Sequence, residues 1–174
     1  MTRWTLGIDP GKTGAAVLLD GDGHIARCWD TPTITIGKKA TYDLTAIAGI
    51  AKIARDYHTD VAIEQVHAMP GQGVTSMFEF GRGLGIWQGV IAAQLIPVTY
   101  YTPQAWQKTQ LAGMPKGKGS ARLRAKQLWP ACTLFDRVKD DGRADAALIA
   151  RHHQNQTARQ GASPPAGPDT RSTR

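Results

Sequence analysis

The chain has 174 residues, of which 41% are hydrophobic, and its formal net charge is +7 with a pI of about 9.7. This length suits one domain with a sizeable core, and no run of roughly 18 apolar residues is present to span a membrane. The charge at Asp9 interrupts any signal-peptide hydrophobic region, so we expect a cytoplasmic location. Cys28 and Cys132 are too few for a disulfide scaffold and lack metal-site spacing.

Hydrophobic periodicity predicts strands and helices along most of the chain. The expected strands are residues 4–9, 14–19, 24–29, 60–66 and 97–101. The expected helices are residues 42–57, 75–95, a short helix from residue 103, residues 120–129 and residues 142–154. We expect Thr41 to cap the first helix, Thr102 to cap the short one, and residues 31–39 to form a loop. Residues 1–155 then form one domain, and residues 156–174, rich in Pro, Ser and Arg, form a disordered tail.

Three meander strands followed by alternating helices and strands predict an α/β fold. Its sheet is a mixed five-stranded one, with three antiparallel strands, then two parallel strands, and helices on both faces. In such a sheet the ends of the first and fourth strands are neighbours, which brings Asp9 close to Glu64. The last helix carries Asp141 and Asp145 at spacing i, i+4, so these two carboxylates share one helix face.

The stretch L-G-I-D-P-G-K-T-G at residues 6–14 has three interpretations. Asp9 can simply cap the turn made by Pro10 and Gly11. The G-x-x-x-G-K-T pattern can be a phosphate loop, although it is one residue short of the usual spacing and no helix pattern follows. Asp9 can also be a metal ligand, which requires partner carboxylates from elsewhere in the chain.

Those partner carboxylates are Glu64, Asp145 and Asp141. Like charges gathered at one place cannot all stay ionised without a cation. Hard divalent ions prefer oxygen ligands, and Mg²⁺ binds through few carboxylates together with substrate phosphate. Two such ions would make a site for phosphodiester hydrolysis.

A long segment of one charge sign points to the substrate. Residues 80–135 contain no Asp or Glu, whereas solvated surfaces usually mix both signs. A polyanion partner is the natural explanation. The basic residues of this segment are Arg82, Lys108, Lys116, Lys118, Arg122, Arg124 and Lys126.

Three motifs resemble one known family. G-I-D-P-G at residues 7–11, A-I-E-Q-V at 62–66 and A-D-A-A-L-I-A at 144–150 look like the RuvC-type Holliday-junction resolvases, most of all the bacteriophage-encoded branch. The resemblance implies a ribonuclease-H-like fold, a homodimer and Mg²⁺-dependent cleavage of four-way DNA junctions, with no small-molecule cofactor. It implies Asp9, Glu64 and Asp145 as metal ligands, two ions per active site, and Mn²⁺ as a substitute.

The sequence departs from the family at two places. Better-known members have an acid or His three residues before the last Asp, where this chain has Gly142, so Asp141 is the nearest candidate for a fourth ligand. The family often has Phe after Glu-Gln-Val, where this chain has His67, so His67, Phe78 or Phe80 is expected to stack on junction bases. The expected DNA-contacting residues are His67, Arg82, Lys108, Lys116, Lys118, Arg122 and Arg124.

The resemblance points to the helix at residues 75–95 as the dimer contact, and Phe78, Leu84, Trp87 and Ile91 give it more apolar area than a small sheet needs. Three other functions stay open. The chain can be a nuclease for branched DNA in general, a non-catalytic DNA-binding protein, or a relative of the actin-like ATPases, whose second lobe its length does not accommodate.

Overall fold

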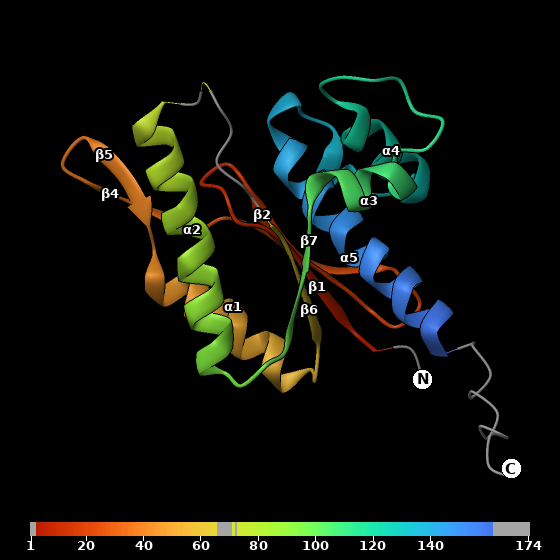
Figure 1. Ribbon diagram of the computed structural model, residues 1–174, viewed down its shortest axis with the longest axis horizontal. Coiled ribbons are helices and arrows are strands. Elements are labelled where there is room, and N and C mark those ends of the chain that lie inside the picture. The colour runs from red at the N-terminus through yellow and green to blue at the C-terminus, as the bar shows by residue number, and fades with distance from the viewer. Residues whose placement is uncertain (1–2, 66–70, 72, 162–174) are drawn as a thin grey trace, which may run out of the picture.

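The computed structural model describes residues 3–65, 71 and 73–161, which form one mixed sheet with helices on both sides (Figure 1). The sheet has five strands in the order β3-β2-β1-β6-β7: β1 (Thr5–Asp9), β2 (Ala15–Leu19), β3 (Ile25–Asp30), β6 (Asp60–Glu64) and β7 (Val98–Tyr101). A separate hairpin consists of β4 (Thr33–Ile36) and β5 (Lys39–Tyr42). The helices are α1 (Leu44–Asp56), α2 (Val74–Ala93), α3 (Pro103–Gln110), α4 (Ser120–Leu128) and α5 (Asp141–Gly161), with 3-10 turns at Thr133–Phe135 and Val138–Asp140.

The predicted sheet is confirmed in both strand order and direction. β1 pairs antiparallel with β2 and parallel with β6, and β6 pairs parallel with β7. Ile8 lies opposite Ile63, so the last residues of β1 and β6, Asp9 and Glu64, lie at the same edge of the sheet. The carboxyl ends of parallel strands are where open α/β sheets gather functional groups.

Both faces of the sheet are buried because successive side chains point to opposite sides. Leu6 and Ile8 pack with residues of α1 and α2 on one face, whereas Val17 and Ala62 pack with residues of α3, α4 and α5 on the other. Figure 1 shows the two helical layers, with α1 and α2 left of the strands and α3 to α5 right of them.

α5 lies unusually close to the centre of the sheet. A Cβ atom built on Gly7 of β1 would lie 2.1 Å from the Ala146 carbonyl oxygen and 2.6 Å from the Ala150 nitrogen. Only glycine allows the backbone of α5 to approach β1 in this way. Ala146 and Ala150 are themselves small, so the backbone of α5 packs almost directly against the backbone of β1.

Three local predictions were wrong. Residues 31–39, predicted as loop, contain most of the β4–β5 hairpin, whose T-I-T-I strand is exposed at every position and so shows no burial pattern. Asp43, not Thr41, caps α1, since its Oδ1 accepts a hydrogen bond from the Ala46 amide at 3.0 Å. The third is the end of the last helix: α5 continues past Gln154 into the predicted tail, since no Gly or Pro occurs between Gln154 and Gly161. The rest of the predicted tail, residues 162–174, lies outside the described residues.

The interpretation of α2 also needs correction. Trp87 and Ile91 were counted among its surplus apolar residues, but both are fully buried in the core that α2 forms with α1 and the sheet. Phe78 is 69% exposed and does remain outside that core. Within the described ranges, no helix combines the length and apolar character needed to cross a membrane.

Candidate active site

Asp9 ends β1 and begins the tight turn that leads into β2. Its Oδ1 accepts a hydrogen bond from the Gly11 amide at 3.2 Å, so the carboxylate does cap this turn. The phosphate-loop interpretation is wrong, because the turn leads into strand β2 and not into a helix. Burial raises the pKa of Asp9 to about 6, against the lowering effect of the Gly11 amide.

Glu64 ends β6 beside Asp9 and is half-buried. Its Oε1 accepts a hydrogen bond from the Nε1–H of Trp106 in α3, at 2.9 Å. Burial raises the pKa of Glu64 to about 7; the Trp106 hydrogen bond opposes this rise, and the negative charge of Asp9 adds to it.

Asp145 approaches from α5. Burial raises its pKa to about 8, and the negative charges of Asp9, Glu64 and Asp141 raise it further. Asp145 is thus close enough to the other three carboxyl groups for their charges to raise its pKa. Among the described residues, no Lys, Arg or His forms an ion pair with Asp9, Glu64 or Asp145.

Asp141 differs from the other three because it has a cationic partner. Its Oδ1 accepts a charged hydrogen bond from Arg122 Nε in α4 at 2.6 Å, and Arg122 Nη1 also donates to the Arg137 carbonyl oxygen at 3.3 Å. Arg122 therefore ties α4 to the start of α5. It was predicted to contact DNA, and in the structure its guanidinium binds a carboxylate of the acidic cluster.

Gly142 occupies the position where better-known family members have an acid or His. A Cβ atom built there would lie 2.4 Å from the Thr13 carbonyl oxygen and 2.7 Å from the Gly14 Cα. Since the β1–β2 turn fills this space, no side chain of any kind fits at position 142. The departure from the family pattern thus follows from how closely α5 packs on the turn.

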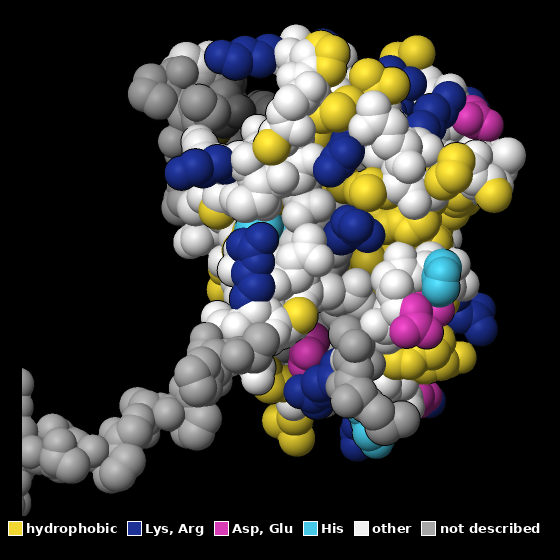
Figure 2. All heavy atoms as spheres, turned by 90° about the vertical axis from the view of Figure 1, so that its right-hand side faces the viewer, with side chains coloured by type: hydrophobic (Ala, Val, Ile, Leu, Met, Phe, Trp, Pro, Cys, Tyr) yellow, Lys and Arg dark blue, Asp and Glu magenta, His cyan; other side chains and the backbone are white. Residues whose placement is uncertain are grey.

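A pocket of about 540 Å³ opens beside the acidic cluster. The glycine-rich loop before α4 contributes Lys116 and Lys118 to its lining, and α5 contributes Asp141 and Asp145. On the face toward the viewer in Figure 2, Lys and Arg side chains are widely spread and acidic side chains are sparse. Two predicted phosphate-binding lysines thus lie across a pocket from two of the predicted metal ligands.

The other predicted DNA contacts are scattered. Lys108 is exposed on α3, and Arg124 Nη1 donates to Gln127 at 3.2 Å within α4. Arg82, on the opposite helical layer, donates to Thr41 Oγ1 at 2.9 Å. His67 lies outside the described residues.

Phe80 lies against the turn that follows Asp9. It is 37% exposed, and its ring borders the turn that follows Asp9, since a Cβ atom built on Gly11 would lie 3.5 Å from Phe80 Cε2. An exposed aromatic ring at this position is suited to stacking on a base beside the cluster.

Sequence reasoning missed Trp106, which contacts Glu64. A weak signal was present: Thr102 and Pro103 start a helix directly after the strand that neighbours β6, and Trp106 lies one turn into that helix. Nothing in the local pattern marks its indole as a hydrogen-bond donor to a particular carboxylate.

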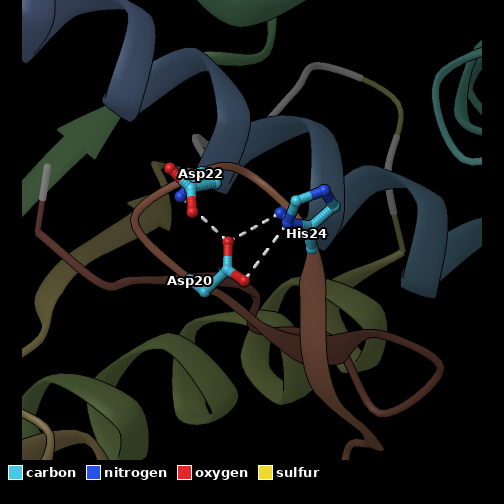
Figure 3. Close-up of side chains that lie close together, drawn as sticks. All are labelled: Asp20, Asp22 and His24. Carbon is cyan, nitrogen blue, oxygen red and sulfur yellow. Dashed lines mark hydrogen bonds and ion pairs between the residues drawn. The ribbon is translucent and has the colours of Figure 1, made fainter.

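Among the described residues, the one group of three potential ligands whose ligand atoms all lie within 4.8 Å of one another is Asp20, Asp22 and His24 in the β2–β3 turn (Figure 3), so the carboxylates of the acidic cluster lie farther apart than that. The amide groups of Asp22 and His24 donate to Asp20 Oδ1 at 3.0 and 2.8 Å, so hydrogen bonding within the turn accounts for this arrangement. The turn follows Leu19, at the end of β2 opposite to the end that pairs with Asp9. It is therefore separate from the acidic cluster.

Comparison with known proteins identifies the family. The structure of Thermus thermophilus RuvC in complex with a Holliday junction substrate has a TM-score of 0.64 and 17% identity, over 91% of this chain and 96% of that one. A second T. thermophilus RuvC structure has a TM-score of 0.55 and 21% identity, with the same coverage of 91% and 96%. No curated protein matches in sequence. The fold is thus the ribonuclease-H-like fold of RuvC, and the family model for crossover junction endodeoxyribonuclease RuvC matches residues 5–153, so this chain belongs to that family.

Proposed function

We propose that this protein resolves four-way DNA junctions by divalent-metal-dependent hydrolysis, making paired nicks as a homodimer. One observation carries the proposal: Asp9, Glu64 and Asp145 converge from β1, β6 and α5, and no basic side chain of the described residues neutralises them. Burial raises the pKa values of all three, and neighbouring carboxylates raise those of Glu64 and Asp145 further. Family membership supplies the reaction class.

The donor set of the cluster fits Mg²⁺ or Mn²⁺. All its potential ligands are carboxylate oxygens, which hard divalent ions prefer, and the missing positive charge is what such ions would supply. Asp9, Glu64 and Asp145 would hold them, two per active site, while Asp141 engages Arg122 and is the weaker candidate ligand. Bound ions of this kind stabilise charge on phosphate oxygens and activate the attacking water.

The chain's own residues bind and orient the DNA. Lys116 and Lys118, across the pocket from Asp145, attract the phosphate backbone, and Lys108 and Arg124 extend the basic surface along α3 and α4. Phe80, beside the Asp9 turn, stacks on a base next to the scissile phosphate. Branched DNA is thus the partner we propose, and the free thiols of Cys28 and Cys132 suit the cytoplasm.

The α2 helix is the surface we propose for the dimer contact. Gly81, Gly85 and Gly89 recur every four residues, and a Cβ atom built on any of them would meet nothing within 4 Å. This open strip, next to the exposed ring of Phe78, allows a second helix to approach closely. A two-fold dimer would present two identical active sites to a substrate that needs two opposed nicks.

The Glu64→Gln substitution tests the metal-site assignment. It keeps the Trp106 hydrogen bond but removes the negative charge, so we expect no detectable cleavage and unchanged junction affinity in EDTA. The measurement is nicking of labelled four-way, three-way, flap and linear DNA, with and without Mg²⁺.

The matched control is Asp22→Asn, which removes a carboxylate of the exposed β2–β3 turn and should leave cleavage intact. Cleavage by Glu64→Gln at the wild-type rate would contradict the assignment. Equal cutting of all branched substrates would identify a general debranching nuclease.

A further inference from the structure

The hydrogen bond from Trp106 to Glu64 joins a fully buried side chain to a proposed metal ligand. An indole N–H can only donate, so it binds Glu64 Oε1 as an acceptor whether or not the carboxyl group is protonated. Among the described residues, Trp106 is the only hydrogen-bond partner of the Glu64 side chain. Oε1 of Glu64 therefore accepts a hydrogen bond, whereas Oε2 has no hydrogen-bond partner among the described residues.

The donor is held rigidly by the chain around it. Glu64 lies opposite Tyr101 in the parallel β6–β7 pair, and the Gln65 amide donates to the Tyr101 carbonyl oxygen at 2.7 Å. The next residue, Thr102, caps α3 by accepting from the Ala105 amide at 3.3 Å. The strand pairing that places Glu64 thus also fixes the start of the helix that carries its donor.

A second contact anchors the same turn of α3 to α5. The Thr109 hydroxyl donates to the Trp106 carbonyl oxygen at 3.0 Å and lies 2.8 Å from Nδ1 of the buried His152. The Trp106 ring also belongs to the core cluster under α5. Trp106 is therefore fixed relative to α5, the helix that carries Asp145.

A glutamate side chain has three rotatable bonds, and the negative charge of Asp9 repels this one. Without a donor, Glu64 would gain freedom and turn away from the cluster. Resting on the proposed function, we propose that Trp106 is a positioning residue that holds Glu64 Oε1 and thereby directs Oε2 to the divalent ion. Such partners of metal ligands typically change metal affinity about 10–100-fold.

The test compares Trp106→Phe with Trp129→Phe. Trp129 is a matched control because its Nε1 also donates at 2.9 Å, to the Gly23 carbonyl oxygen, and its side chain is also buried. The first readout is the affinity of the DNA-free protein for Mn²⁺ by titration calorimetry, and the second is junction affinity in EDTA. We expect Trp106→Phe to weaken Mn²⁺ binding about 10–100-fold and to leave junction affinity unchanged, whereas Trp129→Phe changes neither.

A double variant separates positioning from a general loss of packing. In the Glu64→Gln background the carboxylate is already gone, so Trp106→Phe should weaken Mn²⁺ binding no further. If Trp106→Phe does not fold, 3-benzothienylalanine at position 106 keeps the ring shape and removes only the N–H. Wild-type Mn²⁺ affinity in a folded variant without the N–H would overturn the inference. Absence of Mn²⁺ binding and of cleavage in the wild type would instead overturn the proposed function.

Discussion

The raised pKa of Asp145 shows that the acidic cluster lowers the stability of the folded chain as the pH rises. Its pKa is raised from the ordinary 3.8 to about 8, first by burial and then by the charges of Asp9, Glu64 and Asp141. The folded state therefore keeps a proton that the unfolded state releases above about pH 4. Folding binds this proton, so the stability due to Asp145 is present at low pH and is lost as the pH rises towards 8.

The Asp145→Asn variant isolates this effect. In EDTA, its melting temperature relative to wild type should rise steadily between pH 5 and pH 8, because the wild type must ionise one more buried carboxyl group than the variant. Scanning calorimetry across this range measures the difference, and added Mg²⁺ serves as the control condition. Added Mg²⁺ should stabilise the wild type most at pH 8. A difference that stays constant with pH would contradict the raised pKa.

At the scale of elements, the packing of α5 on the β1–β2 turn determines which residues can serve the site. Gly142 has no room for a side chain against Thr13 and Gly14, and Gly7 has none against Ala146. These two contacts bring the start and the middle of α5 down onto the sheet. This packing places Asp145 near the ends of β1 and β6, where Asp9 and Glu64 lie.

The Gly142→Ala substitution should therefore be destabilising, by about 1–3 kcal/mol, because the added methyl group overlaps backbone atoms of the turn. Cleavage should fall with it, since Asp145 moves away from Asp9. Gly49→Ala in α1 is the control: a Cβ atom there meets nothing within 4 Å, so we expect a gain of roughly 0.5–1 kcal/mol from helix propensity. Urea denaturation measures both, and equal stability of Gly142→Ala and wild type would refute the packing argument.

The same elements show how far sequence reasoning reaches. The strand-end acids Asp9 and Glu64 could be predicted because an apolar run that ends in a carboxylate is a local pattern, and parallel strands align their ends. The β4–β5 hairpin was missed although T-I-T-I alternates polar and apolar β-branched residues, because each strand has only four residues and the two form a sheet of their own. The Trp106 hydrogen bond and the crowding at Gly142 depend on distances between elements, which no local pattern encodes.

At the scale of the whole molecule, one chain brings together one acidic cluster, whereas resolving a four-way junction requires two nicks. The exposed glycine strip of α2 is where we expect the second copy to bind. Trp87 is unsuitable for testing this contact because it is buried in the chain's own core. A residue of the strip itself is needed.

Gly85→Glu is that test. The side chain enters open space, so the fold should survive, but a charge in the strip should prevent a second α2 from approaching. Sedimentation at micromolar concentration should give a dimer for wild type and for the control Gly49→Glu, and a monomer for Gly85→Glu that nicks one strand or none. A monomeric wild type that makes paired nicks in one binding event would exclude the dimer.

The placement of the acids along the chain has a consequence for biosynthesis. Asp9 and Glu64 leave the ribosome well before Asp145, and the sheet face that α5 covers stays open until that helix follows. A nascent chain therefore holds only part of the acidic set. Chains that stall or are cleaved before α5 carry Lys116 and Lys118 of the glycine-rich loop but lack Asp145 and the side chains that cover one face of the sheet, so we expect them not to cut DNA.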